Sequence, residues 1–215
     1  MSKMILVDEK TVKQALEALR DAVTENSMQA KAAAYASLMH KDQKYGQRPY
    51  TFHLNMVVDI VRANGGTIEQ ITAAWLHDTI EDTSATRNDI EQQFGKEVAD
   101  MVWALTGIGQ TRDECIDNAI EKIATTPGAG LIKLADRFAN VTACIDEGKT
   151  QWLGKYIQEY KRLRPVLPDI PLLRQLDLQI EKAKSLAAAE AITEAEYAQL
   201  AEPSTGSAPT KGPSI

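Results

Sequence analysis

Two histidines and several carboxylates stand in this sequence as the ligands of one metal ion would. The run HDTIED, residues 77–82, puts an imidazole and three carboxyl groups within six residues. His53 lies upstream of this run and Asp136 lies downstream. Imidazole and carboxylate ligands suit a divalent transition metal, and four of them leave coordination positions open for water and substrate. We therefore predict a hydrolase whose metal site is formed by His53, His77, Asp78 and Asp136.

Two further carboxylates of the same run, Glu81 and Asp82, are placed to act on water. On an α-helix residues four apart share a face, so we expect His77 beside Glu81 and Asp78 beside Asp82. One wall of a pocket would then carry metal ligands, with two more carboxylates one turn further along. Carboxylates next to an attacking water can accept its proton. The spacing therefore predicts an acid/base pair beside the metal.

A solvated polar face of a surface helix is the alternative for such an acidic cluster. The residues that precede it, Ile71, Ala74, Trp75 and Leu76, are apolar and indicate a mostly buried helix. Clustered carboxylates are costly in a buried setting unless a metal or hydrogen bonds compensate them. The metal site is therefore the better interpretation.

The elements that position these side chains are predicted to be helices. The chain is rich in Ala, Leu, Ile, Glu and Lys, and only 6% of its residues are aromatic, which favours helices over sheets. Apolar spacing and capping residues, including Thr67, predict helices over residues 9–24, 28–43, 49–63, 68–81, 86–93, 95–106, 112–124, 128–146, 150–165 and 170–200. The chain is therefore predicted to be all-α.

A length of 215 residues fits one domain of ordinary size. We assign residues 1–200 to this domain. The remaining residues, 201–215, are rich in Pro, Gly, Ser and Thr and cannot bury enough apolar surface to order themselves. We predict that they form a flexible tail. A homo-oligomer stays open, because a single sequence does not reveal an interface.

The net charge of −6 argues against attraction to nucleic acid or to an anionic membrane. No segment approaches the length of a membrane-spanning helix or of a signal-peptide core. The two cysteines, Cys115 and Cys144, are far apart and form no CxxC pair, so a disulfide framework is not expected. We predict a cytoplasmic protein that binds neither nucleic acid nor membranes and captures any anionic substrate through local cations.

The run HDTIED resembles the His-Asp and Glu-Asp signature of the HD-domain phosphohydrolases, and in particular of their RelA/SpoT hydrolase branch. Other segments resemble motifs of that branch and occur in the same order over residues 28–165. They are HKDQK at 40–44, PYTFH at 49–53, FGKEV at 94–98, ALT at 104–106 and LIKLADRFANV at 131–141. The chain has the length of the single-domain type, the small alarmone hydrolases.

This resemblance implies an HD-domain helical bundle with Mn²⁺ held by the four ligands named above. Glu81 and Asp82 would orient and deprotonate the attacking water. Asn140 would lie near a guanosine moiety, and Tyr156 near the substrate. Lys44 and Arg48 would lie beside the nucleotide and its phosphates, in a turn about one residue shorter than in the family. Basic side chains there, with Lys133 and Arg137 as further candidates, would supply a positive field that the acidic chain lacks.

The sequence departs from the family pattern at two positions. Leu54 stands where the family often has a proline, and Ala139 stands where a histidine commonly precedes the asparagine. Neither position is a metal ligand. The departures therefore bear on the identity of the substrate more than on metal binding.

The activity that the resemblance implies is hydrolysis of the 3′-pyrophosphate of ppGpp or pppGpp to GDP or GTP and pyrophosphate. Two alternatives stay open. Another phosphohydrolase of the same superfamily would use the same metal site on deoxynucleotides or on the 2′-phosphate of NADPH. A non-catalytic module would bind a nucleotide without turnover, but such a sensor has no need for Glu81 and Asp82.

Two further residues lie near these motifs. His40 is the third histidine, and because four ligands already suffice we expect it to be partly buried and hydrogen-bonded near the pocket rim. Arg112 follows a loop at residues 107–110. That loop is either a cover for the substrate or the lead into a solvated helix capped by Thr111.

Overall fold

The computed structural model of this chain describes residues 23–24 and 27–201, with side chains described as far as Ala189. The helix predicted over 9–24 lies outside this range except for residues 23–24, which are helical. The predicted tail lies outside it except for Ala201, which ends the last helix. The division into a domain at 1–200 and a tail at 201–215 stays a prediction.

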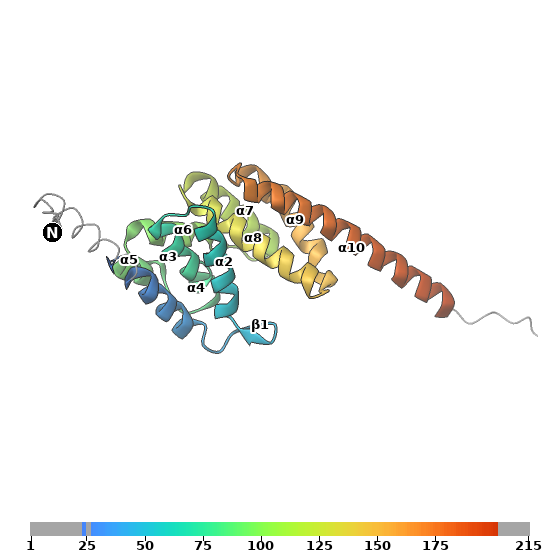
Figure 1. Ribbon diagram of the computed structural model, residues 1–215, viewed down its shortest axis with the longest axis horizontal. Coiled ribbons are helices and arrows are strands. Elements are labelled where there is room, and N and C mark those ends of the chain that lie inside the picture. The colour runs from blue at the N-terminus through green and yellow to red at the C-terminus, as the bar shows by residue number, and fades with distance from the viewer. Residues whose placement is uncertain (1–22, 25–26, 202–215) are drawn as a thin grey trace, which may run out of the picture.

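Helices make up most of the described chain (Figure 1). A helix over residues 27–39 comes first, and an antiparallel hairpin of β1 (Lys44–Tyr45) and β2 (Arg48–Pro49) follows it. The later elements are α2 (Thr51–Ala63), α3 (Ile68–Leu76), α4 (Thr79–Asp82), α5 (Arg87–Phe94), α6 (Lys96–Leu105), α7 (Arg112–Thr125), α8 (Ala129–Asp146), the 3₁₀ turn η1 (Thr150–Trp152), α9 (Leu153–Leu163), the 3₁₀ turn η2 (Arg164–Val166) and α10 (Pro171–Ala201). The all-α prediction is confirmed.

The core lies where α2, α3, α6 and α8 meet, and α9 and the first half of α10 pack against α8 (Figure 1). These four helices contribute large, fully buried side chains to the core: Leu54, Leu76, Met101, Ile132 and Leu134. Burying one such side chain contributes about 1.5–3 kcal/mol. A shared core of this kind holds α2, α3 and α8 in fixed relative positions, and these helices carry the predicted metal ligands.

Threonine capping boxes define the starts of three helices. Thr67 opens α3, Thr86 opens α5 and Thr111 opens α7, and each hydroxyl accepts a hydrogen bond from the backbone N–H three residues later. The side chain of that later residue in turn accepts from the backbone N–H of the threonine, which satisfies two donors that a helix start leaves unpaired. The predicted caps at Thr67 and Thr111 are confirmed.

The helix predicted over 28–43 ends earlier, because a hairpin intervenes before α2. Gly46 has a φ of 62°, which allows the tight turn between the two strands. Pro49 lies in β2 instead of opening a helix, and α2 begins at Thr51. The hairpin strands are only two residues long. Such short strands leave no alternating pattern for a sequence analysis to detect.

The single helix predicted from Thr67 through Glu81 is wrong, because the structure contains two helices with a break at His77 and Asp78. The hydroxyl of Thr79 donates to the carbonyl of Leu76 at 2.6 Å, and Nδ1 of His77 lies 2.9 Å from the carbonyl oxygen of Ala74. Side chains that bond to nearby backbone carbonyls compete with the regular hydrogen bonds of a helix. The acidic run therefore does not follow the continuous helical spacing assumed for it.

Candidate active site

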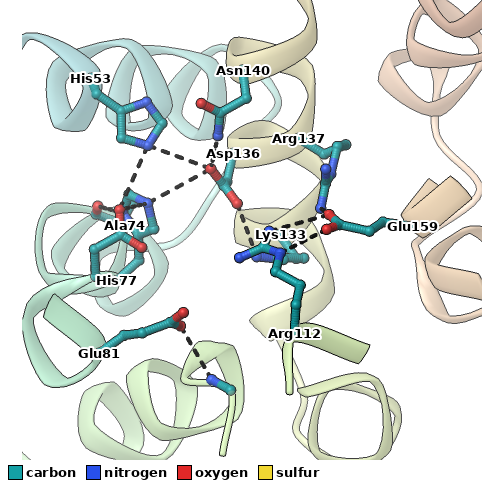
Figure 2. Close-up of polar contacts among 12 residues, drawn as sticks. His53, Ala74, His77, Glu81, Arg112, Lys133, Asp136, Arg137, Asn140 and Glu159 are labelled. Carbon is teal, nitrogen blue, oxygen red and sulfur yellow. Dashed lines mark hydrogen bonds and ion pairs between the residues drawn. The ribbon is translucent and has the colours of Figure 1, made fainter. Parts of the chain in front are cut away.

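Three buried residues from separate elements converge on one point (Figure 2). His53 comes from α2, His77 from the break between α3 and α4, and Asp136 from α8. Each offers one ligand atom, and these atoms lie within 4.8 Å of one another. Oδ1 of Asp136 is 3.4 Å from Nε2 of His53 and 3.9 Å from Nε2 of His77. The tertiary structure thus unites three of the four predicted ligands.

The imidazole of His77 has the orientation that a metal ligand needs. Its Nδ1 faces the carbonyl oxygen of Ala74, so Nδ1 carries the proton and Nε2 has a free lone pair. Nε2 is buried and faces two carboxylates, that of Asp78 at 2.9 Å and that of Asp136 at 3.9 Å. A histidine that donates from one ring nitrogen to a carbonyl and turns the other toward a shared centre is typical of metal sites. These residues therefore fit a divalent metal ion.

The fourth predicted ligand, Asp78, lies at the edge of this group. Its Oδ2 is 2.9 Å from Nε2 of His77 and 3.7 Å from Nε2 of His53. The hydroxyl of Tyr50 donates to the same oxygen at 2.5 Å. Among the described residues Asp78 is not one of the three whose ligand atoms lie mutually within 4.8 Å. Its assignment as a ligand stays a prediction, which its closeness to both imidazoles supports.

Proton affinity at the centre reflects the crowding of carboxylates. Burial lowers the pKa of His77, but Asp78 and Asp136 outweigh burial and raise that pKa to about 9. Burial raises the pKa of Asp136, but Lys133 and the two histidines outweigh it and hold that pKa well below its usual range. A bound metal ion competes with protons for the same ligand atoms. The site therefore carries the negative charge that a divalent cation would neutralise.

A chain of hydrogen bonds holds Asp136 in place. Nζ of Lys133 donates to Oδ2 at 3.0 Å, and Nδ2 of Asn140 donates to Oδ1 at 2.6 Å. The hydroxyl of Tyr45 then donates to Oδ1 of Asn140 at 3.1 Å. The ring of Tyr45 stacks on the ring of His53, with centroids 4.9 Å apart and planes 14° apart. The sequence predicted no role for the side chains of Tyr45 and Tyr50, because their hydroxyl groups meet partners that are 95 and 28 residues away in the chain.

The predicted acid/base residues lie beside this centre on α4. Glu81 lines the same pocket as His53, Asp78 and Asp136, and its carboxylate accepts a hydrogen bond of 3.2 Å from the backbone N–H of Gly107. Loss of contact with water in the pocket raises the pKa of Glu81, which makes its carboxylate a better proton acceptor. Asp82 also lines the pocket. Their assignment to proton transfer stays a prediction.

Four cations line this pocket of about 280 Å³ as well. They are Arg112, Lys133, Arg137 and Lys155. Lys133 and Arg137 were candidates from sequence, the role of Arg112 was open and Lys155 was missed. The signal that pointed to Arg112 was its place at the start of a helix after a loop with two glycines. Positive side chains beside a metal centre suit an anionic substrate such as a phosphate ester.

A buried glutamate that sequence analysis did not identify holds two of these cations (Figure 2). Oε1 of Glu159 is 2.8 Å from Nε of Arg112, and Oε2 is 2.7 Å from Nη2 of Arg137. Burial raises the pKa of Glu159, but the two arginines outweigh it and lower that pKa. Glu159 thereby links α7, α8 and α9 and sets the position of both guanidinium groups.

A second pocket of about 250 Å³ adjoins the first and is lined by Lys44, Asn140 and Tyr156, which are three of the four predicted substrate-binding residues. Asn140 and Tyr156 line both pockets, together with Tyr45 and Lys155. The two pockets are therefore parts of one cleft. The metal centre lies in one part and a group of lysines lies in the other.

The fourth predicted substrate-binding residue, Arg48, is not brought to this cleft. Its guanidinium group lies 4.0 Å from the centroid of the Phe52 ring. Both residues line a separate groove of about 580 Å³ between α2 and α8. In the prediction Arg48 shares a nucleotide site with Lys44. The short hairpin instead directs Lys44 and Arg48 into different pockets.

His40 is a buried residue with a side-chain hydrogen bond. It is 3% exposed, and its Nδ1 lies 2.7 Å from Oε1 of Gln43. It is not in the group of potential metal ligands found among the described residues. The hydrogen bond expected for His40 is present, but the residue is buried, whereas the sequence predicts partial burial near the pocket rim.

Within residues 23–24 and 27–201, no helix has the length and apolar character that crossing a bilayer requires. The helices that carry the site are amphipathic and pack through a shared core.

Residues 32–159 match the family model of the HD domain. This match covers more than half of the chain and includes every predicted metal ligand and both predicted acid/base residues.

Two relatives are similar to this chain in sequence. The human guanosine-3′,5′-bis(diphosphate) 3′-pyrophosphohydrolase MESH1 is 30% identical over 148 residues, which cover 60% of this chain and 76% of that protein. A guanosine-3′,5′-bis(diphosphate) 3′-pyrophosphohydrolase of Aquifex aeolicus is 36% identical over 130 residues, which cover 57% of this chain but only 18% of that protein. The chain thus spans most of the human relative and less than a fifth of the Aquifex one.

Two solved structures resemble the fold. One is described as a metazoan ortholog of SpoT that hydrolyzes ppGpp; it has a TM-score of 0.58 and 26% sequence identity, over 73% of this chain and 93% of that one. The other is a protein of Listeria monocytogenes EGD-e with a TM-score of 0.52 and 26% identity, over 63% of this chain and 99% of that one. Both likenesses extend over nearly the whole of the solved chains.

Proposed function

This chain belongs to the HD domain family, and we propose that it hydrolyses the 3′-pyrophosphate of ppGpp or pppGpp to GDP or GTP and pyrophosphate. One observation carries the proposal: His53, His77 and Asp136, a buried group that could hold a metal ion, lie at a cleft that four cations also line. Human MESH1, which this chain matches over 76% of its length, is named for the same reaction.

The residues of the centre would hold one divalent ion, and we propose Mn²⁺. Two imidazoles with carboxylates are a mixed donor set that suits a transition metal better than Mg²⁺ or Ca²⁺, which prefer oxygen ligands alone. Such an ion lowers the pKa of water and acts as a Lewis acid toward phosphoryl oxygens. The choice of Mn²⁺ among transition metals rests on the resemblance to the RelA/SpoT branch.

Glu81 and Asp82 would form the acid/base pair that accepts a proton from the attacking water. The oxygen of water bonds to the phosphorus next to the ribose, the bond between that phosphorus and the 3′ oxygen breaks, and the 3′ oxygen takes up a proton. A carboxylate within reach of the water accepts one proton as the new bond forms. The raised pKa of Glu81 favours this residue as the acceptor.

Arg112, Lys133, Arg137 and Lys155 would bind the pyrophosphate and balance the charge that develops on it. Arg112 and Arg137 are held by Glu159 before any substrate arrives, so they lose little freedom when the substrate binds. The second pocket, with Lys44 and Tyr156, would take the nucleoside. Asn140 already uses both ends of its amide on Asp136 and Tyr45, so its main contribution would be to position these two residues.

The test is pyrophosphate release from ppGpp by purified protein with Mn²⁺. A His77→Ala, Asp78→Ala double variant is the control for contaminating hydrolases. We expect Mn²⁺-dependent release by the wild type and none by the variant. NADPH and deoxynucleoside triphosphates are tested in parallel. Turnover of one of these instead of ppGpp would retain the metal centre and replace the substrate, and nucleotide binding without any turnover would identify a binding module.

A further inference from the structure

His40 lies outside the metal centre but is linked to two of its carboxylates. It follows the helix over 27–39 and is 3% exposed. Its ring stacks on the ring of Tyr50, with centroids 4.7 Å apart and planes 25° apart. Tyr50 in turn donates to Oδ2 of Asp78 at 2.5 Å. The proposed reaction gives His40 no part, so its buried place needs another explanation.

The second link runs through Gln43. Oε1 of Gln43 lies 2.7 Å from Nδ1 of His40, and Nε2 of Gln43 donates to Oδ2 of Asp82 at 2.9 Å. A carboxylate only accepts hydrogen bonds, so the NH₂ end of the amide must face Asp82 and the oxygen must face His40. The Nδ1 of His40 must then carry the proton. Its Nε2 is buried without a hydrogen-bond partner in the described part of the chain.

This arrangement settles which way the Gln43 amide points. A glutamine amide can rotate by half a turn and exchange its oxygen and nitrogen at little steric cost. The exchanged form would put Oε1 against the Asp82 carboxylate, where two acceptors repel each other. His40 disfavours this form as well, because its Nδ1–H would face the NH₂ group of the amide, and the other tautomer would bury an N–H on Nε2 that has no partner among the described residues. Backbone hydrogen bonds from Gln43 N to His40 O and from Tyr50 N to Gln43 O keep the three residues together.

Asp82 has few other constraints on its side chain. It is exposed and ends α4, a helix of only four residues. Its backbone N–H bonds to the carbonyl of Asp78, but that bond does not orient the carboxylate. Gln43 supplies the one side-chain hydrogen bond to Asp82 found in the described part of the chain. The position of this carboxylate therefore depends on Gln43 and, through it, on His40.

We propose that His40 is a positioning residue that acts through Gln43: its Nδ1–H fixes the Gln43 amide so that the NH₂ group holds the Asp82 carboxylate at the pocket. The stacking of His40 on Tyr50 also supports the hydroxyl that holds Asp78. This inference rests on the proposed function, because it assigns to Asp82 a part in proton transfer.

Four variants test the relay. His40→Phe keeps a ring to stack on Tyr50 but has no N–H for Gln43. His40→Asn loses the ring but places an amide N–H close to the position of Nδ1. Gln43→Met keeps the length of the side chain and removes both hydrogen bonds. Asp42→Asn is the control, because this neighbouring side chain is 91% exposed.

We expect kcat for pyrophosphate release to fall about tenfold in His40→Phe and in Gln43→Met, because each loses a hydrogen bond that positions a charged group. His40→Asn should retain kcat within about threefold, and Asp42→Asn should match the wild type. KM and the Kd for Mn²⁺ should change less than about twofold in His40→Phe, Gln43→Met and Asp42→Asn, which keep a ring stacked on Tyr50, since a positioning role in proton transfer affects kcat alone. The double variant His40→Phe, Gln43→Met should be no slower than either single variant, because both act on one chain of contacts.

A readout without turnover separates this inference from the proposed function. The ¹⁵N resonances of the His40 ring should show a proton on Nδ1 in the wild type, and Gln43→Met should shift the Nδ1 resonance. If the wild type does not hydrolyse ppGpp but the ring shows this tautomer and this shift, the proposed function fails and the relay stands. A proton on Nε2 of His40, or an equal kcat in the wild type and Gln43→Met where both fold, would overturn the relay. Circular dichroism melting curves establish that each variant is folded.

Discussion

The hydroxyl of Tyr50 donates a hydrogen bond of 2.5 Å to Oδ2 of Asp78. Tyr50 follows the hairpin and precedes α2, and Asp78 lies in the break between α3 and α4. The contact therefore ties the segment that carries His53 to the segment that carries His77. It also leaves Oδ2 of Asp78 aimed at both imidazoles, at 2.9 and 3.7 Å from their Nε2 atoms.

Removing this hydroxyl should weaken metal binding. Tyr50→Phe keeps the ring that stacks on His40 but leaves Asp78 free to rotate. Because residues that orient metal ligands typically contribute about 10–100-fold to affinity, we expect the Kd for Mn²⁺ to rise by about tenfold. Isothermal titration calorimetry measures this change. Tyr35→Phe, on the helix over 27–39 and in contact with Phe94, is the matched control. An unchanged Kd in Tyr50→Phe would show that Asp78 does not need this hydrogen bond to bind metal.

Metal removal should lower both activity and thermal stability. Without an ion the carboxylates of Asp78 and Asp136 repel each other, and this repulsion opposes the ionised form of Asp78. An ion that binds only the folded state stabilises it by about 2.7 kcal/mol at a concentration 100 times its Kd. We expect EDTA to abolish pyrophosphate release and lower Tm, and Mn²⁺ to restore both. His77→Ala should show no rise in Tm with Mn²⁺; a rise equal to that of the wild type would place the ion elsewhere.

The two carboxylates of α4 should affect turnover without affecting metal binding. Glu81→Gln and Asp82→Asn keep the size of the side chain but cannot accept a proton from water. General base catalysis contributes typically about 10²–10⁴-fold, so kcat should fall by a factor in this range for the residue that accepts the proton. The Kd for Mn²⁺, measured by calorimetry, should stay close to the wild-type value. A large loss of metal affinity instead would make Glu81 or Asp82 a ligand.

Glu159 should matter for folding stability as well as for the cleft. The Glu159→Leu change leaves the guanidinium group of Arg137, which is 3% exposed, without its buried partner. Breaking a buried ion pair from one side costs about 3–5 kcal/mol. We expect urea denaturation to show a loss of this size. Glu181→Gln, which removes an exposed pair with Lys184, should cost less than about 1 kcal/mol. A similar small loss in Glu159→Leu would mean that water reaches Arg137.

The contribution of Glu159 should also depend on pH in a defined direction. Burial raises its pKa, but Arg112 and Arg137 outweigh burial, so the pKa in the folded state lies below the ordinary value of 4.5. A lowered folded pKa gives stability that is present above the unfolded pKa and is lost as pH falls through the folded one. The difference in free energy of unfolding between the wild type and Glu159→Gln should therefore be constant above pH 5 and narrow below pH 4.5. Denaturation curves at several pH values measure it, and a gap that widens in acid would contradict this sign.

Local signals were sufficient for the chemical content of the site and for most of the helices. Types and spacing of residues predicted His53, His77 and Asp136 as metal ligands, and the structure brings their ligand atoms within 4.8 Å of one another. Threonine caps and apolar periodicity located α3 and α7 at their starts, because a helix start depends on side chains within one turn. The caps and the apolar periodicity depend on residues close to one another in the chain.

Tertiary contacts decided the rest. The break at His77 and Asp78 lies where local periodicity favours a continuous helix, and at this break the two side chains meet Asp136 of α8 and His53 of α2. The pairing of Arg112 and Arg137 with Glu159 depends on packing, because the two arginines lie on other helices, 47 and 22 residues away from Glu159 in the sequence. The same holds for the link from His40 through Gln43 to Asp82. A charged or polar side chain shows its chemistry in the sequence, but its partner and orientation are set only when the packed core brings distant helices together.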